Sequence, residues 1–164
     1  MKALITGGAG FAGSHLTEYL LEQGQEVAVL ARDADKLRNL EHVLSKIEVI
    51  RGDILDCERV SAVLKQARPQ RIYHLAALSS PADSFQNPRL TYQVNFTGTF
   101  NLLSGWHQAG FNSRFLLVSS SQVYGQTSEE QLPLREDTPM RPASPYGGSK
   151  AAAEMLAVQF FESY

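Results

Sequence analysis

Four glycines crowd into seven residues directly after a short apolar run, in the N-terminal sequence MKALITGGAGFAG. The run Lys2–Thr6 is typical of a buried strand, but the glycine segment is not, because glycine costs backbone entropy and leaves nothing to pack. In the following FAGSHLTEYLLEQG, apolar residues recur at helical intervals, and Gly24 is placed to end the helix. The chain therefore begins with a strand, a glycine turn and a helix, in that order.

This glycine turn suits the binding of a phosphate group. A helix N-terminus carries unsatisfied N–H groups and the positive end of the helix dipole, and glycine lets the backbone approach the anion. The spacing fits the dinucleotide fingerprint GxGxxG through Gly8, Gly10 and Gly13, and its variant GxxGxxG through Gly7, Gly10 and Gly13. A purely structural tight turn is the alternative, but the strand before it and the helix after it favour dinucleotide binding.

Strands and helices keep alternating along the rest of the chain. Short apolar runs predict strands at residues 26–31, 47–51, 71–75 and 114–119, and helical periodicity predicts helices at 36–44, 57–67, 90–109 and 145–164, with Asp56 as an N-cap. This alternation predicts an α/β fold, a Rossmann-type doubly wound parallel sheet with helices on both faces. Ligands of such sheets bind beyond the carboxyl ends of the strands. The stretch 125–144, rich in Pro, Glu and Thr, is expected to be an extended loop that carries function or moves.

The composition narrows the class of protein further. The chain has 164 residues, which suits one domain with a real core, and its net charge of −2 argues against a general nucleic-acid binder. No apolar run approaches the roughly 18 residues of a membrane span. The strand at the N-terminus does not fit a signal peptide, so we expect a cytoplasmic protein without a membrane partner. Cys57 is the only cysteine, which excludes an internal disulfide and argues against a metal site.

A second motif, SPYGGSKAAAE, lies near the end of the sequence. Tyr146 and Lys150 are four residues apart on the predicted helix, so they share one face and can touch. An ammonium beside a phenol favours the phenolate, and a tyrosine so placed can exchange a proton near neutral pH. For these two residues alone, an ordinary pair on a solvated helix surface is the simpler interpretation.

Six motifs taken together resemble one known family. TGGAGFAG, GDILD, HLAALSS, NFTGT, SSSQVYG and PYGGSK occur in the order and spacing of the extended short-chain dehydrogenase/reductase family and cover nearly the whole chain. Within it, the chain is similar to the NAD(P)-dependent epimerases and dehydratases of nucleotide sugars, above all to the GDP-mannose 4,6-dehydratase and GDP-4-keto-6-deoxymannose reductase group. The resemblance implies that residues 1–164 form an NAD(P)-binding Rossmann domain that bears a catalytic Ser, Tyr and Lys. Family members continue for about as long again with a small substrate domain, so we expect a fragment of a longer protein, a homodimer in its full-length form.

The resemblance also implies which residues hold the cofactor. The pyrophosphate is expected against Gly7, Gly10, Phe11, Ala12 and Gly13. The adenine is expected against Asp53 and Ile54. The nicotinamide ribose is expected against Leu75, Ala76 and Ala77. Asn95 is expected to brace the active-site end of the helix 90–109.

For the reaction itself, the resemblance assigns three residues. Tyr146 is the acid/base, Lys150 holds the ribose hydroxyls and favours the phenolate, and Ser120 hydrogen-bonds the reacting sugar oxygen. The remaining substrate contacts are expected from Ser79, Ser80, Ser121 and Gln122.

The end of the second predicted strand departs from the family pattern. Members that prefer NAD place an acidic residue there to bind the ribose 2′-hydroxyl, but this chain has Ala31 followed by Arg32. A missing acid and an adjacent arginine suit a 2′-phosphate, so the sequence favours NADP. Asp33 could still turn inward, which keeps NAD open.

A second departure concerns Gln122, where the 4,6-dehydratases usually carry the Glu that removes the C5 proton. An amide is not basic at neutral pH, so the sequence favours a 4-keto reductase acting on a GDP-linked sugar. A 4,6-dehydratase and a 4-epimerase are the alternatives, and a non-catalytic dinucleotide-binding sensor is a third.

The histidines are expected to have structural or surface roles. His74 ends the predicted strand 71–75 and should pack and hydrogen-bond. His15, His42 and His107 lie on predicted helices without an evident partner and should be on the surface.

Overall fold

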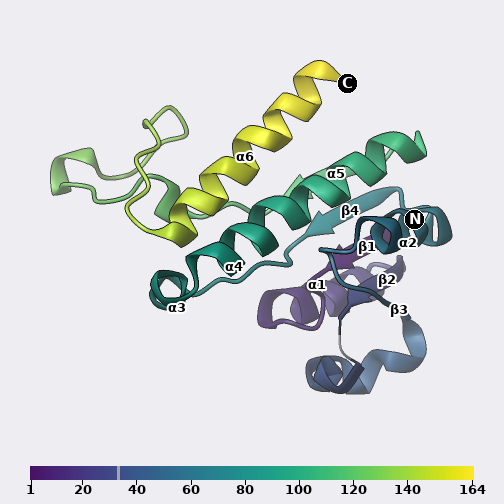
Figure 1. The fold of residues 1–164 in the computed structure, drawn as a ribbon. Helices are drawn as coiled ribbons and strands as arrows, with labels where there is room; N and C mark the ends of the chain where they lie inside the picture. The colour runs from purple at the N-terminus through teal and green to yellow at the C-terminus, as the bar shows by residue number, and fades with distance from the viewer. Residues whose placement is uncertain (33) are drawn as a thin grey trace. The chain divides into compact units, whose positions relative to one another are not determined.

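The computed structural model describes residues 1–32 and 34–164. Its strands and helices, shown in Figure 1, are β1 (Lys2–Thr6), α1 (Phe11–Glu22), β2 (Glu26–Ala31), η1 (Ala34–Lys46), β3 (Glu48–Arg51), α2 (Cys57–Ala67), β4 (Arg71–His74), α3 (Pro81–Gln86), α4 (Pro88–Tyr92), η2 (Gln93–Thr97), α5 (Gly98–Ala109), β5 (Arg114–Leu117), η3 (Ser121–Val123), η4 (Glu129–Gln131) and α6 (Pro145–Ser163). The chain divides into two units, the first made of Met1–Ala76 and Gly98–Val118, the second of Ala77–Thr97 and Ser119–Tyr164.

The first unit is built on one parallel sheet. Its strand order is β3-β2-β1-β4-β5, and every neighbouring pair is parallel. In the register of the central strand, Ile5 pairs with Val29 on one side and with Tyr73 on the other. The order reverses between β1 and β4, as in a doubly wound sheet, so the Rossmann-type α/β fold predicted from the sequence is confirmed.

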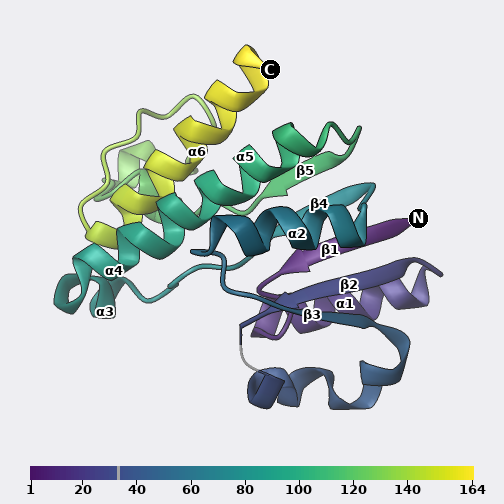
Figure 2. The same cartoon turned by 45° about the vertical axis from the view of Figure 1, so that its right-hand side comes forward.

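Apolar layers cover both faces of this sheet. Leu4 and Ile72 face a core formed with α2 and α5, whereas Ala3, Ile5 and Val29 face a second core formed with α1 and η1. Figure 2 shows α1 and α2 on opposite faces. Successive strand residues point to opposite faces, so continuous apolar strands are what a sheet with two covered faces requires.

The second unit is organised around α6, against which α3, α4, η2 and η3 pack. Ser144 begins α6 as its N-cap, accepting a hydrogen bond from the N–H of Gly147 at 3.0 Å, and Pro145 fills the first helical position. The segment 125–144 between η3 and α6 is irregular apart from the single turn η4, which agrees with the predicted loop (Figure 1). A hydrogen bond from Arg141 N to Val123 O, 3.0 Å long, ties the base of this loop together.

Two predicted helices are found in place but differ from regular α-helices. The predicted helix 36–44 lies within the longer 3₁₀ helix η1, which is kinked at Leu37. The predicted helix 90–109 is found as α4, the π-helical turn η2 and α5, which follow one another without a gap, and the preceding α3 was not predicted. The sequence signals for α3 and α4 are Pro81 and Pro88, because proline lacks an N–H and is tolerated only in the first turn of a helix.

The other predicted elements agree with the structure within one or two residues at each boundary. The helix 57–67 is found as α2, and Asp56 caps it by accepting from Arg59 N at 2.9 Å. Gly24 follows α1 with a φ of +67°, a conformation that favours glycine. Among the helices of residues 1–32 and 34–164, none is long and apolar enough to span a bilayer.

Candidate active site

The glycine turn of the first unit is packed more tightly than a phosphate site alone requires. Gly7 has a φ of +73°, and a Cβ there would lie 2.7 Å from the backbone nitrogen of Ala76. A Cβ on Gly13 would collide with the carbonyl oxygen of Gly7 and lie 2.6 Å from Gly8 Cα. A Cβ on Gly10, in contrast, would meet only Gly7 O at 3.2 Å. Gly7 and Gly13 are therefore required for packing within the protein, whereas the structure demands less of Gly10.

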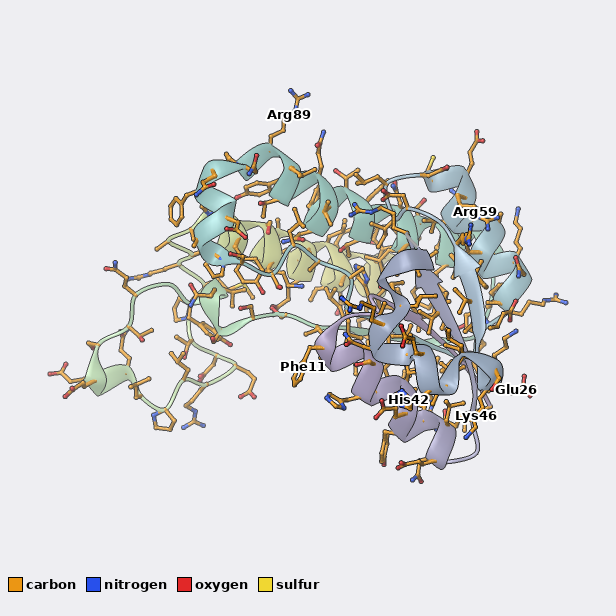
Figure 3. The ribbon with its side chains drawn as sticks, turned by 90° about the horizontal axis from the view of Figure 1, so that it is seen from below. Phe11, Glu26, His42, Lys46, Arg59 and Arg89 are labelled. Carbon is orange, nitrogen blue, oxygen red and sulfur yellow. The ribbon has the colours of Figure 1, made fainter. Side chains whose placement is uncertain are left out.

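The N-terminus of α1 follows this turn directly. Gly10 is the extended N-cap residue and supplies no side chain to the N–H groups of the first turn, which contains no acidic residue. Ala12 is exposed, and Phe11, 80% exposed, projects away from the helix start (Figure 3). Within the described residues, the amides of this first turn have no side-chain cap and suit an anion.

Arg32 and Asp53 lie near each other after β2 and β3. Arg32 Nη1 is 3.9 Å from Asp53 Oδ2, and both side chains are more than one-third exposed, so the pair contributes little to stability. Asp53 also accepts a hydrogen bond from Leu55 N at 2.9 Å. Ile54 is 7% exposed, and its side chain belongs to the core of the first unit. Asp33, the alternative acid for an NAD ribose, lies outside the described residues.

The end of β4 is held by a network around His74. His74 is 2% exposed, with Nδ1 2.6 Å from Thr6 Oγ1 and Nε2 2.9 Å from Thr99 Oγ1. Thr6 Oγ1 also accepts from Ala76 N at 3.3 Å, and Thr6 O accepts from Leu75 N at 3.1 Å. The predicted structural role of His74 is confirmed, and the network fixes the backbone of Leu75 and Ala76.

The remaining histidines lie on the surface, as predicted. His107 is exposed, and the side chains of His15 and His42 are 63% and 61% exposed. His42 Nε2 is 2.9 Å from Glu18 Oε1, a partner that the sequence did not reveal. In the described part of the chain, no group of three His, Cys, Asp or Glu residues could hold a metal ion.

Tyr146 and Lys150 lie in the second unit, on α6. They are 9% and 6% exposed, so the interpretation as a solvated surface pair is wrong. The Tyr146 N–H donates to Ser84 Oγ at 3.1 Å, and Ser84 in turn donates to Pro81 O at 2.6 Å. Burial lowers the pKa of the Lys150 ammonium below its ordinary value, and the negative charge of Glu154 opposes part of this change.

The two glycines between Tyr146 and Lys150 bring other segments close to α6. A Cβ on Gly147 would lie 2.5 Å from Gln122 O, and one on Gly148 would collide with the hydroxyl of Tyr92. The pair therefore lets η3 and α4 pack directly against the first turns of α6.

Asn95 connects three segments of the second unit. Its Oδ1 accepts from Leu78 N at 2.8 Å, and its Nδ2 donates to Leu78 O at 3.1 Å and to Ser149 Oγ at 2.9 Å. Ser149 donates onward to Tyr146 O at 2.7 Å. Asn95 lies in the π-helical turn η2, a local irregularity that is frequent at functional sites. The network links the chain after Ala77 to the turn that bears Tyr146.

The other predicted substrate residues fall at the starts of two short helices. Ser120 begins η3 by accepting from Gln122 N at 3.2 Å, and the side chains of Ser121 and Gln122 are exposed. Ser80 begins α3 by accepting from Asp83 N at 3.1 Å, while Ser79 is exposed.

Sequence reasoning missed several residues that hold the site. Thr6, Ser84 and Ser149 each act through hydrogen bonds to residues far away in sequence, and no local pattern marks them. The Ser119 hydroxyl donates to Glu154 on α6, and this contact was also missed. Only their proximity to the recognised motifs could have suggested them.

A parallel sheet with a glycine turn at α1, and a buried Tyr-Lys pair on α6, define an extended short-chain dehydrogenase/reductase. A family model described as GDP-mannose 4,6 dehydratase matches residues 4–164. The chain belongs to this family.

Relatives in this family carry different names. The chain is 35% identical to a GDP-mannose 4,6-dehydratase of Yersinia enterocolitica, covering 99% of this chain and 46% of that protein. It is 33% identical to a GDP-6-deoxy-D-mannose reductase of Pseudomonas aeruginosa, covering 97% and 47%. Among solved structures, the UDP-glucose 4-epimerase of Thermus thermophilus in complex with NAD superposes with a TM-score of 0.91 at 38% identity, covering 100% and 52%. The chain thus spans about half the length of the relatives it matches.

Proposed function

We propose that the full-length protein is an NAD(P)-dependent oxidoreductase that acts at C4 of a nucleotide sugar. The observation that carries this proposal is the buried Tyr146–Lys150 pair on α6, in a chain whose glycine turn leaves the α1 amides open to an anion. The relatives named dehydratase, reductase and epimerase support this class of reaction.

The residues of the first unit fit a dinucleotide. Gly10 and the amides of Phe11 and Ala12 would hold the pyrophosphate, because a side chain is absent from the place where the backbone must approach it. Leu75 and Ala76 would lie along the nicotinamide ribose. The bound cofactor supplies or accepts the hydride.

The residues of the second unit would carry the proton. Tyr146 would donate a proton to the sugar oxygen on C4 as the ketone is reduced, and Ser120 would hydrogen-bond the same oxygen. Lys150 would bind the ribose hydroxyls and stabilise the phenolate left on Tyr146. Asn95 and Ser84 would keep the backbone on either side of this tyrosine in place.

The favoured reaction is reduction of a 4-keto-6-deoxy sugar linked to GDP. Gln122 supports it, because a C5 proton cannot be removed by an amide, whereas reduction of a C4 ketone needs no base at C5. A 4,6-dehydratase is the second candidate, favoured by the family model and by the Yersinia enterocolitica relative.

For the cofactor, we propose NADP. The exposed guanidinium of Arg32 and the absence of an acid at Ala31 suit a 2′-phosphate. NAD is the alternative, supported by the NAD complex of the Thermus thermophilus epimerase. A homodimer of the full-length protein is proposed on the family resemblance alone.

Steady-state assays of the full-length protein distinguish the candidates. A reductase consumes NADPH with GDP-4-keto-6-deoxymannose and incorporates no C5 deuterium from deuterated water. Formation of a 4-keto product from GDP-mannose would instead identify a dehydratase, and interconversion of C4 epimers would identify an epimerase. Dinucleotide binding without any turnover would identify a sensor.

A further inference from the structure

Glu154 is a half-buried carboxylate on α6 that the proposed reaction does not use. Its Oε2 accepts a hydrogen bond from the hydroxyl of Ser119, the residue directly before Ser120. Glu154 also follows Lys150 by four residues on the same helix, so the two side chains lie on one face of α6. All of these residues belong to the second unit.

The ammonium group of Lys150 is in an environment that favours a nearby carboxylate. Lys150 is 6% exposed, and within residues 1–32 and 34–164 no hydrogen bond or direct ion pair is made by its ammonium. Burial of this side chain makes its charged form less favourable and lowers the pKa of Lys150. The carboxylate of Glu154 favours the charged form.

Other charged groups near this part of α6 are few. The titratable side chains on α6 beside Lys150 and on the helices packed against it are Tyr146 and Glu154 on α6, Asp83 on α3, and Arg89 and Tyr92 on α4. Arg89 points away from the protein (Figure 3), and Asp83 is exposed. In these packed segments, Glu154 is therefore the one carboxylate one helical turn from Lys150.

We propose that Glu154 is a positioning residue for Lys150. The Ser119 hydroxyl holds the Glu154 carboxylate, and this carboxylate keeps the buried side chain of Lys150 charged, as it must be to stabilise a phenolate on Tyr146. A neutral amine would not stabilise a phenolate on Tyr146. The meaning of this arrangement for turnover rests on the proposed function, but the charge state of Lys150 can be measured without turnover.

The test is competitive labelling of lysines in the full-length protein with trace acetic anhydride, read by mass spectrometry of the Lys150 peptide. Only the neutral amine reacts, so the pH at which the rate reaches half its plateau reports the titration of Lys150, and limited access affects only the plateau. In Glu154→Gln this midpoint should move to lower pH. Below both midpoints, the rate relative to its plateau should rise by about 3- to 10-fold, as expected for loss of a nearby opposite charge.

Glu162→Gln is the matched control, because Glu162 is an exposed carboxylate on the same helix. It removes an equal charge and should leave the midpoint unchanged. An unchanged midpoint in Glu154→Gln, or equal changes in both variants, would overturn the proposal. If Glu154→Gln does not fold, Ser119→Ala decides: a smaller change in the same direction supports the proposal, and a wild-type midpoint refutes it.

A second readout separates this inference from the proposed reaction. If the protein turns over, the pH profile of kcat should shift in Glu154→Gln and not in Glu162→Gln. If the wild-type protein shows no turnover, the proposed function fails, whereas the labelling result still decides the role of Glu154.

Discussion

Replacing single glycines of the first turn should separate packing from ligand binding. In Gly13→Ala the new methyl group collides with the carbonyl oxygen of Gly7 and approaches Gly8 Cα to 2.6 Å. Both obstacles are backbone, which cannot rotate away as a side chain can. In Gly10→Ala the methyl group meets only Gly7 O at 3.2 Å, a distance that a small shift can relieve.

The expected magnitudes follow from these contacts. An alanine in a helix interior gains about 1 kcal/mol over glycine, but overpacking of a rigid site costs about 1–3 kcal/mol. Because the obstacles at Gly13 are rigid, the upper part of that range applies, and we expect a net loss of about 1–2 kcal/mol. For a chain of this size that corresponds to a fall in Tm of about 2–8 °C. Gly10→Ala should change the free energy of unfolding by less than about 1 kcal/mol.

Two assays on the same protein samples test this reasoning. Urea unfolding gives the free energy of unfolding, and a fluorescence titration with NADPH gives the affinity for the dinucleotide. Gly10→Ala should bind NADPH at least about tenfold more weakly, a loss of about 1.4 kcal/mol, while remaining folded. A Gly13→Ala protein as stable as wild type would refute the packing argument. A Gly10→Ala protein with unchanged affinity would refute the ligand role of Gly10.

Four further predictions concern charge and proton transfer. Arg32→Asp should weaken NADPH binding by about 1–3 kcal/mol and NADH binding far less, measured by the same titration, and equal losses would remove the 2′-phosphate assignment. Tyr146→Phe should lower kcat by about 10²-fold with little change in NADPH affinity, and near-normal turnover would contradict its role as acid. Burial holds the pKa of Lys150 in the folded protein below 10.5. Between that lowered pKa and 10.5 the unfolded state binds more protons than the folded state, so the free energy of unfolding should rise as the pH increases through this range. Urea unfolding as a function of pH should show that rise in wild type but not in Lys150→Met. The hydrogen bond from Lys2 lowers the pKa of Glu48 in the folded protein. The contribution of this pair to the free energy of unfolding should therefore be lost as the pH falls through that pKa. This loss should occur only in proteins that retain Glu48.

The sheet could be predicted from the sequence because each strand is marked by a local signal, an apolar run or a turn. The runs at Lys2–Thr6 and Glu26–Ala31 are continuously apolar in their interiors, as expected for a strand covered on both faces, and the glycine turn marks where the first strand ends. Asp56 marked the start of α2 correctly because an N-cap interacts with residues next to it in sequence. Signals of this kind are local, so a single sequence is enough to detect them.

The sequence-based predictions are incomplete where contacts between residues distant in sequence determine the local structure. The helix 90–109 was predicted without an irregularity, but Asn95 lies in a π-helical turn with its amide bonded to Leu78 and Ser149. The burial of Lys150 was not predicted either, because helical spacing gives the face on which a residue lies but not what covers that face. The hydroxyl of Ser84 supports Tyr146 from 62 residues away, and no periodicity encodes such a contact.

Some residues of the recognised motifs are required by packing within the protein, and others are available for ligand binding or for the reaction. Only the second group bears on function. Gly7 and Gly13 in the first unit are required by backbone packing, as Gly147 is in the second unit, so a protein could retain all three for folding alone. Gly10 and Gln122 differ from them, because a Cβ on Gly10 would meet only Gly7 O, at 3.2 Å, and Gln122 is exposed. A change at the packing glycines therefore tests the fold, whereas a change at Gly10 or at the Gln122 side chain tests the ligand and the reaction. The choice between reductase and dehydratase accordingly depends on the amide of Gln122 more than on the presence of the complete motifs.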